Sequence, residues 1–245
     1  MKKIFFISSF IIFFTILFCA NNLLAINKLV IWSTIDQKIE NKNTINELYN
    51  FLEKNHENIF KNIKINELEV PHIAIAIAGI IKEENGEKYI LNNKNKKILL
   101  KDVISAIEKA ISDNKIEKSD LDQAKFNLKP GSRFSKPINE KQFYIIQKPL
   151  LKKNHYIYTI AKSIKKELSD IGLNPEIFKP LVSSTHVYSN DKKTINKLQY
   201  LQNYPKFFKI LKDVPESNGL TCSNIEILID SANNYDIIKT FDLKK

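Results

Sequence analysis

The segment from Val70 to Ile81 (VPHIAIAIAGII) constrains the fold of this chain most strongly, because it is the most apolar stretch after residue 25. Pro71 disfavours a helix at its start, and the β-branched residues that follow favour a strand. The segment therefore predicts a strand. It carries His72, one of only four histidines in the chain.

Helices and strands alternate along the rest of the sequence. Further strands are expected at residues 29–35, 88–91, 142–147, 181–189, 224–229 and 241–243, and residues 119–128 lead into another. Helices are expected at residues 44–60, 102–112, 156–171 and 191–201. Turn signals stand at Asn85-Gly86 and at Pro130-Gly131, Pro149 is expected to end the strand at 142–147, and Gly172 ends a helix. This order, without a dinucleotide-binding fingerprint, is typical of an α+β protein.

Two stretches repeat the same order of strand, helix and histidine-bearing strand. They run from Leu29 to Ile77 and from Gln142 to Ser189. Such a repeat predicts a duplicated, pseudo-twofold α+β fold with the two histidine strands near its centre. Residues 26–245 are expected to form this single two-lobed domain.

The first 25 residues read as a signal peptide. Lys2 and Lys3 precede an apolar run from Ile4 to Phe18, and Ala25 is an acceptable cleavage residue. The alternative is an uncleaved N-terminal membrane anchor. The chain is therefore expected to be exported, either to a periplasm or as a secreted protein.

The charge of the chain favours anionic partners. Its formal net charge is +11, which suits RNA ends, nucleotides or an anionic lipid surface without choosing among them. Removal of the leader would leave Cys222 as the only cysteine, so no intramolecular disulfide is expected. We expect Cys222 to fill space in the core.

His72 and His186 both lie in strands among apolar residues, in PHIAIA and THVYSN. The side-chain period of two places His72 with Ala74 on one strand face, and His186 with Tyr188 on another. If the repeats pack about a pseudo-axis, both imidazoles can face one cleft. One imidazole could then accept a proton from an attacking hydroxyl or water while the other protonates the leaving oxygen. A single strand histidine is more often structural, so the matched pair carries this hypothesis.

This pattern resembles the 2H phosphoesterase superfamily, which includes 2′-5′ RNA ligases and RNA cyclic phosphodiesterases. Its members carry two His-x-Thr/Ser-x motifs, one on each lobe of a duplicated α+β fold. The motifs here are His72-Ile73-Ala74-Ile75 and His186-Val187-Tyr188-Ser189, and the helix 156–172 and the tail 225–243 are similar too. The resemblance implies antiparallel sheets that form a central cleft, helices outside, and catalysis by His72 and His186 without a metal or cofactor.

The chain departs from the motif at the residue two positions after each histidine. The family has a hydroxyl residue there that binds a phosphate oxygen, and this chain has Ala74 and Tyr188. Ala74 cannot donate, and the loss of such a donor costs roughly a hundredfold in rate. Tyr188, Arg133 and Lys129 are the expected substrate-binding residues, because a hydroxyl, a guanidinium and an ammonium suit phosphate oxygens. The alternative for Arg133 and Lys129 is a solvated basic loop.

The first functional hypothesis is a metal-independent phosphodiesterase that acts on RNA termini or 2′,3′-cyclic nucleotides through a two-histidine acid–base pair. One alternative is a catalytically impaired relative that binds nucleotides or RNA. Another is an exported basic interaction protein of the cell envelope. The expected partner is a phosphoester, nucleotide or RNA end, or an anionic surface, and the expected oligomeric state is a monomer.

Overall fold

The computed structural model describes residues 27–37, 39, 42–114, 123–135, 142–201, 203–231 and 234–243. The expected signal peptide, residues 1–25, lies outside the described residues. None of the helices that the structure describes is long and apolar enough to cross a membrane.

The described residues form ten strands in one antiparallel sheet. The strands are β1 (Lys28–Ile35), β2 (Lys64–Glu84), β3 (Glu87–Leu91), β4 (Lys97–Leu99), β5 (Lys125–Phe134), β6 (Gln142–Leu150), β7 (Glu176–Ile177), β8 (Val182–Tyr188), β9 (Ser217–Ser231) and β10 (Asn234–Asp242). Hydrogen-bonded neighbours follow the order β1-β9-β5-β6-β8-β2-β3-β4, while β10 pairs with β9 and β7 with β2. Because β2 also pairs with β1, the strands from β1 to β2 in this order close into a ring.

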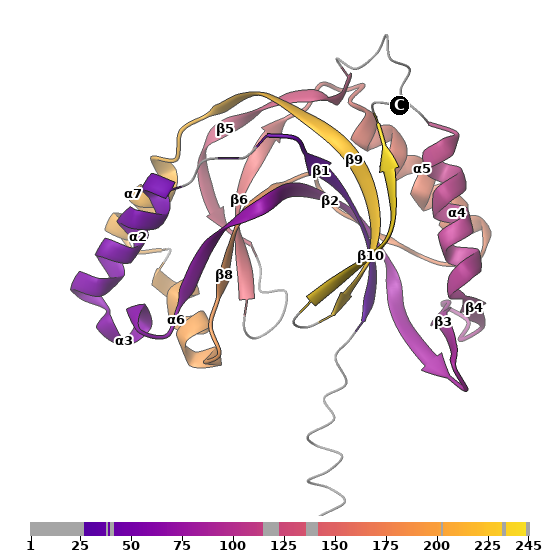
Figure 1. Ribbon diagram of the computed structural model, residues 1–245, viewed down its shortest axis with the longest axis horizontal. Coiled ribbons are helices and arrows are strands. Elements are labelled where there is room, and N and C mark those ends of the chain that lie inside the picture. The colour runs from indigo at the N-terminus through magenta and orange to yellow at the C-terminus, as the bar shows by residue number, and fades with distance from the viewer. Residues whose placement is uncertain are drawn as a thin grey trace, which may run out of the picture.

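The helices lie in two groups at opposite ends of the arched sheet (Figure 1). One group contains α2 (Lys42–Asn55), α3 (Glu57–Phe60), α6 (Lys192–Leu201) and α7 (Pro205–Lys212). The other contains α4 (Leu100–Ser112) and α5 (Tyr156–Asp170). The chain therefore has an α+β fold of two lobes with the helices outside, which we call the α2–α7 lobe and the α4–α5 lobe.

Each lobe has its own buried core. In each repeat, the helix that follows the first strand packs in a core with the first strand of the other repeat. The helix α2 follows β1, yet its Ile45 packs in the α2–α7 core with Phe143 of β6. The helix α5 follows β6, yet its Ile160 packs in the α4–α5 core with Leu29 of β1. This reciprocal exchange agrees with the predicted pseudo-twofold repeat.

The strand predicted at residues 70–81 is part of a longer one, because β2 spans 21 residues. Pro71 lies where the pairing of β2 with β8 is interrupted, between Glu67 and His72. A proline lacks the N–H that a ladder needs, so this gap is where β2 tolerates one. The predicted hairpin turn is confirmed, since Asn85 and Gly86 both have positive φ between β2 and β3.

Several predicted boundaries are wrong. The helix expected over 44–60 is broken at His56, whose φ of −147° and ψ of 55° are not helical. Gly131 does not begin a turn between strands; it has a φ of +83° within an irregular part of β5, and its N–H bonds to the carbonyl of Val214. Pro149 does not end β6, because β6 still pairs with β5 there, with Pro149 opposite Leu128, after its pairing with β8 has stopped at Gln147.

Other elements were not expected or are longer than expected. The helix α7 and the strands β4 and β7 were not predicted, and β9 and β10 are much longer than the segments 224–229 and 241–243. The end of α5 agrees with the sequence, since Gly172 follows it with a φ of +85°. Cys222 is 1% exposed in the core, as expected.

Candidate functional site

His72 lies on β2 beside β1 and is almost completely buried. It pairs with Thr34 of β1, and its side chain is 6% exposed. Its ring centroid is 4.1 Å from that of Trp32, with 30° between the planes. Burial lowers the pKa of His72 to about 4, although a hydrogen bond to the backbone of Val70 acts in the opposite direction. His72 is therefore neutral near pH 7.

His186 lies on β8 and is only half-buried. It pairs with Tyr144 of β6, and its Nε2 lies 3.0 Å from Oε1 of Gln142. Because an amide oxygen can only accept, Nε2 carries the hydrogen in this pair and Nδ1 is left as the acceptor. Burial lowers the pKa of His186 as well.

Tyr144 contacts both histidines. Its ring centroid is 5.8 Å from that of His72 in an edge-on arrangement and 5.4 Å from that of His186. The two imidazoles therefore share one face of the sheet, and their separation cannot exceed the sum of these distances. That sum is below the roughly 12 Å beyond which joint action on one phosphate becomes implausible. Burial raises the pKa of Tyr144 to about 12, so its hydroxyl stays protonated.

Aromatic rings and carboxylates continue this face from His72 toward β10. Trp32 donates its indole N–H to Oε2 of Glu226 at 2.7 Å. The ring of Tyr235 lies 5.1 Å from that of Trp32 and is 51% exposed. Burial raises the pKa of Asp230, whose neighbour across the ladder is Tyr235. We call the surface that contains Trp32, His72, Tyr144, His186, Glu226, Asp230 and Tyr235 the histidine face.

Sequence reasoning did not single out Trp32 or Tyr144. Both stand in predicted strands, in LVIWSTI and QFYIIQ, and each is the large aromatic residue that flanks a histidine strand. Their alternation with core residues could have placed them on the face opposite the helices. Their contacts with the histidines depend on the pairing of β1 with β2 and of β6 with β8.

Tyr188 and Ala74, which stand two residues after His186 and His72, both lie on the histidine face. Only Tyr188 has a side chain that can donate a hydrogen bond. The Tyr188 ring is 6.2 Å from that of His186, and its hydroxyl donates to Oδ1 of Asn190. Ala74 lies opposite Trp32 and offers no polar atom. The position two residues after His72 therefore supplies no hydroxyl donor.

The register with β6 places Arg133 on the sheet face of Tyr144, and Lys129 does not have that placement. Arg133 pairs with Ile146, two residues after Tyr144, while the pairing of β6 with β8 shifts register between Ile145 and Ile146. The guanidinium is exposed. Lys129 is exposed in the irregular part of β5, and no contact among the described residues joins it to either histidine.

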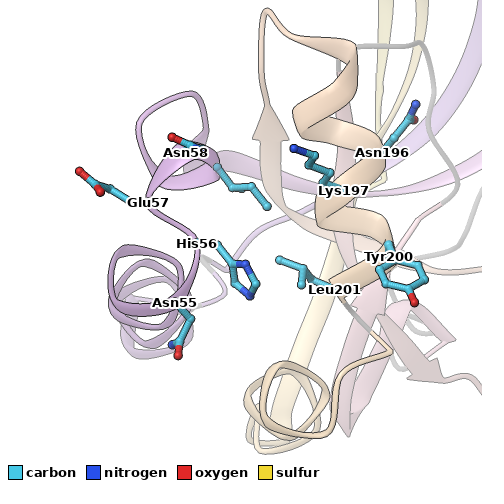
Figure 2. A pocket seen from close by; sticks show the side chains of 9 residues that line it. Asn55, His56, Glu57, Asn58, Asn196, Lys197, Tyr200 and Leu201 are labelled. Atoms are coloured by element: carbon cyan, nitrogen blue, oxygen red, sulfur yellow. The ribbon is translucent and has the colours of Figure 1, made fainter.

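The remaining histidines lie elsewhere. His155 is 1% exposed, and its Nδ1 accepts from the N–H of Ile157 at the start of α5 at 3.3 Å, a structural cap. Burial lowers the pKa of His155 to about 4. His56 points into a surface hollow of 610 Å³ between the α2–α3 junction and α6, opposite Leu201 (Figure 2). That hollow contains neither His72 nor His186 among its lining residues.

The donor set of the histidine face suits proton transfer. Within the described ranges, no group of three or more His, Cys, Asp or Glu side chains is placed to hold a metal ion. The face instead offers two imidazoles, a protonated phenol and an exposed guanidinium. These groups can accept a proton, donate a proton and donate hydrogen bonds to an anion.

Comparisons with solved structures find a distant likeness. No protein-family model matches the chain, and no curated protein matches it. Solved structures of Usb1 from Kluyveromyces marxianus are similar in part. The structure with uridine monophosphate is 9% identical, with 87% of this chain and 98% of that chain covered and a TM-score of 0.42. Another structure of Usb1 is 8% identical, with 86% and 97% covered and a TM-score of 0.41. A likeness this distant assigns neither an activity nor a ligand to the chain.

Proposed function

We propose that the protein is a metal-independent phosphodiesterase that acts on RNA ends or 2′,3′-cyclic nucleotides, with His72 and His186 as its acid–base pair. The observation that supports this proposal is that both imidazoles contact Tyr144 on one face of the sheet. Two imidazoles within reach of one phosphate can divide proton transfer between attack and departure.

The environments of the two histidines suggest which is the base. His72, whose pKa is about 4, is neutral and accepts the proton of the attacking water. The water oxygen bonds to phosphorus, and the bond from phosphorus to the leaving ribose oxygen breaks. His186 in its protonated form gives a proton to that oxygen. Gln142 holds the neutral ring of His186 with its hydrogen on Nε2, so the transferred proton comes from Nδ1.

Tyr144 is suited to replace the donor that Ala74 lacks. Its ring reaches both imidazoles, and a pKa of about 12 keeps its hydroxyl protonated. In this proposal the phenol donates a hydrogen bond to a phosphate oxygen as negative charge develops there. Arg133 stabilises the same charge from the neighbouring strand.

A second candidate is a relative that binds the same ligands without turnover. His72 is 6% exposed beneath Trp32, and Ala74 supplies no donor beside it. The carboxylates Glu226 and Asp230 on the same face oppose an anionic ligand. These observations favour weak or absent turnover.

Turnover and binding assays separate the candidates. The protein is incubated with the four 2′,3′-cyclic nucleotides and with an RNA oligonucleotide that ends in a cyclic phosphate, and binding is followed by calorimetry. Under the first proposal, His72→Ala and His186→Ala each abolish turnover while circular dichroism stays native, and His56→Ala is the matched control. Turnover that survives in both variants would refute the catalytic pair. Binding without products favours the second candidate. If the protein neither binds nor converts these ligands, the alternative of an exported basic interaction protein is favoured.

A further inference from the structure

A groove separate from the histidine face lies on the α4–α5 lobe, between α5, β2 and the segment from Ile177 to Pro180. The groove there has a volume of 490 Å³, within the range of about 300–1,000 Å³ that small-molecule sites occupy. It is lined by Ile75, Ile157, Tyr158, Ala161, Lys162, Lys165, Ile177, Phe178, Lys179 and Pro180, and we call it the α5 groove. It is separate from the histidine face, since Ile75 belongs to the core under α5 whereas His72 stacks on Trp32.

The floor of the α5 groove is apolar. Ile75, Ile157 and Ala161 close its base and are almost fully covered, at 1%, 1% and 8% exposed. The apolar surface that a ligand can reach comes from Tyr158, which is 44% exposed, and from the partly buried Ile177. Phe178 and Pro180 add partly buried apolar surface from the segment after β7. Ala161 is the smallest side chain of this lining, and a larger residue there would fill the space. A hydrocarbon chain in the groove would be removed from water along its length.

Three lysines border this apolar floor. Lys162 and Lys165 stand three residues apart on α5, so they are neighbours on the helix surface that borders the groove. Lys179 approaches from the segment after β7.

Among the residues that the structure describes, none neutralises the positive charge of this border by an ion pair. The three lysines of the groove are exposed and form no ion pair with any residue that the structure describes. Lys166, their neighbour on α5, instead pairs with Glu167 at 3.5 Å. No acidic residue lines the groove.

From the apolar floor and the cationic border we propose that the α5 groove binds a single-chain amphiphile with an anionic head group, such as a long-chain carboxylate. The hydrocarbon chain lies over Ala161 and along Ile177, Phe178 and Pro180, and the head group lies among the three lysines. A cationic head group on the same chain is repelled. This site is independent of the function proposed for the histidine face.

Calorimetric titration with dodecanoate and with dodecyltrimethylammonium, each below its micelle concentration, tests the proposal. The protein is expected to bind one dodecanoate saturably and the cationic amphiphile about tenfold more weakly or not at all. Ala161→Phe is expected to remove binding of dodecanoate. Replacing Lys162, Lys165 and Lys179 together by Gln is expected to weaken dodecanoate about tenfold.

The control is a second triple variant that changes the net charge by the same amount at lysines outside the α5 groove. Lys193, Lys206 and Lys209 are exposed on α6 and α7, and their joint replacement by Gln is expected to leave the affinity unchanged. The proposal is overturned if dodecanoate does not bind, if both amphiphiles bind equally, or if the two triple variants lose affinity equally. It is also overturned if a folded Ala161→Phe binds as the native protein does. If Ala161→Phe does not fold, the lysine variants decide.

Discussion

The imidazole of His72 and the indole of Trp32 form a stack, with centroids 4.1 Å apart and planes 30° from parallel. The stack removes one side of the imidazole from water, and the same burial holds the pKa of His72 at about 4. The residue is therefore available as a proton acceptor over most of the pH range, and carrying a positive charge is costly for it.

The pH dependence of turnover follows from the two lowered pKa values. The proposed mechanism requires His72 neutral and His186 protonated, so kcat/KM should rise as the pH passes about 4. It should fall again as the pH passes the pKa of His186, which burial places below its usual 6.5. The optimum is thus expected in the acidic range, measured with a 2′,3′-cyclic nucleotide in constant ionic strength. A flat plateau that extends beyond pH 8 would contradict the assigned roles.

The stability of the protein should decrease in acid. The unfolded chain binds a proton at His72 near pH 6.5 and the folded chain only near pH 4, so stability is complete above pH 6.5 and is lost as the pH falls from 6.5 to 4. The loss from His72 is at most roughly 3 kcal/mol. His155, whose pKa is also about 4, acts in the same direction. Urea unfolding at several pH values measures this, and His72→Gln should flatten the profile.

Removal of the Tyr144 hydroxyl tests its role as a phosphate donor. Tyr144→Phe keeps the ring contacts with both histidines and removes only the O–H, so the fold should be unchanged. We expect kcat to fall by roughly a factor of ten to a hundred with little change in KM. Tyr188→Phe serves as the comparison, because the Tyr188 hydroxyl is already engaged by Asn190. Equal effects of the two variants would argue against a special role for Tyr144.

Restoring the hydroxyl of the first motif should increase turnover. Ala74 is only partly buried beside Trp32, so a residue of slightly larger volume can be accommodated. Ala74→Thr adds a donor two residues after His72, and we expect up to about a tenfold gain in kcat/KM. Ala74→Val has the same shape without the hydroxyl and is the control. A gain in both variants would indicate a packing effect.

The sequence predicted the elements whose pattern is local. The helix at 156–171 has apolar residues at helical spacing and a glycine after it, and α5 ends as expected before Gly172. The strand that carries His186 contains the β-branched residues Val182, Thr185 and Val187, and β8 matches the predicted segment closely. The duplicated α+β fold followed from the repeated order of such elements.

Elements that depend on distant contacts could not be predicted in the same way. β10 alternates poorly and exposes Tyr235 and Ile237, and it is a strand because β9 supplies its hydrogen bonds. The short helix α7 has only Phe207 and Leu211 as fully buried residues, too few for a clear periodic pattern. The position of Tyr144 against both histidines depends on strand order across the ring, which residue spacing does not encode.

The 21-residue strand β2 belongs to both lobes, since residues near Lys64 pair with β8 and residues near Ile80 pair with β1. The two lobes therefore cannot move apart without breaking the main-chain hydrogen bonds that β2 makes with its neighbouring strands. Admission of a ligand to His72 then depends on rotation of the side chains that cover it, above all Trp32 and Tyr144, which is a faster class of motion than hinge opening. Association kinetics should accordingly lack a slow conformational phase.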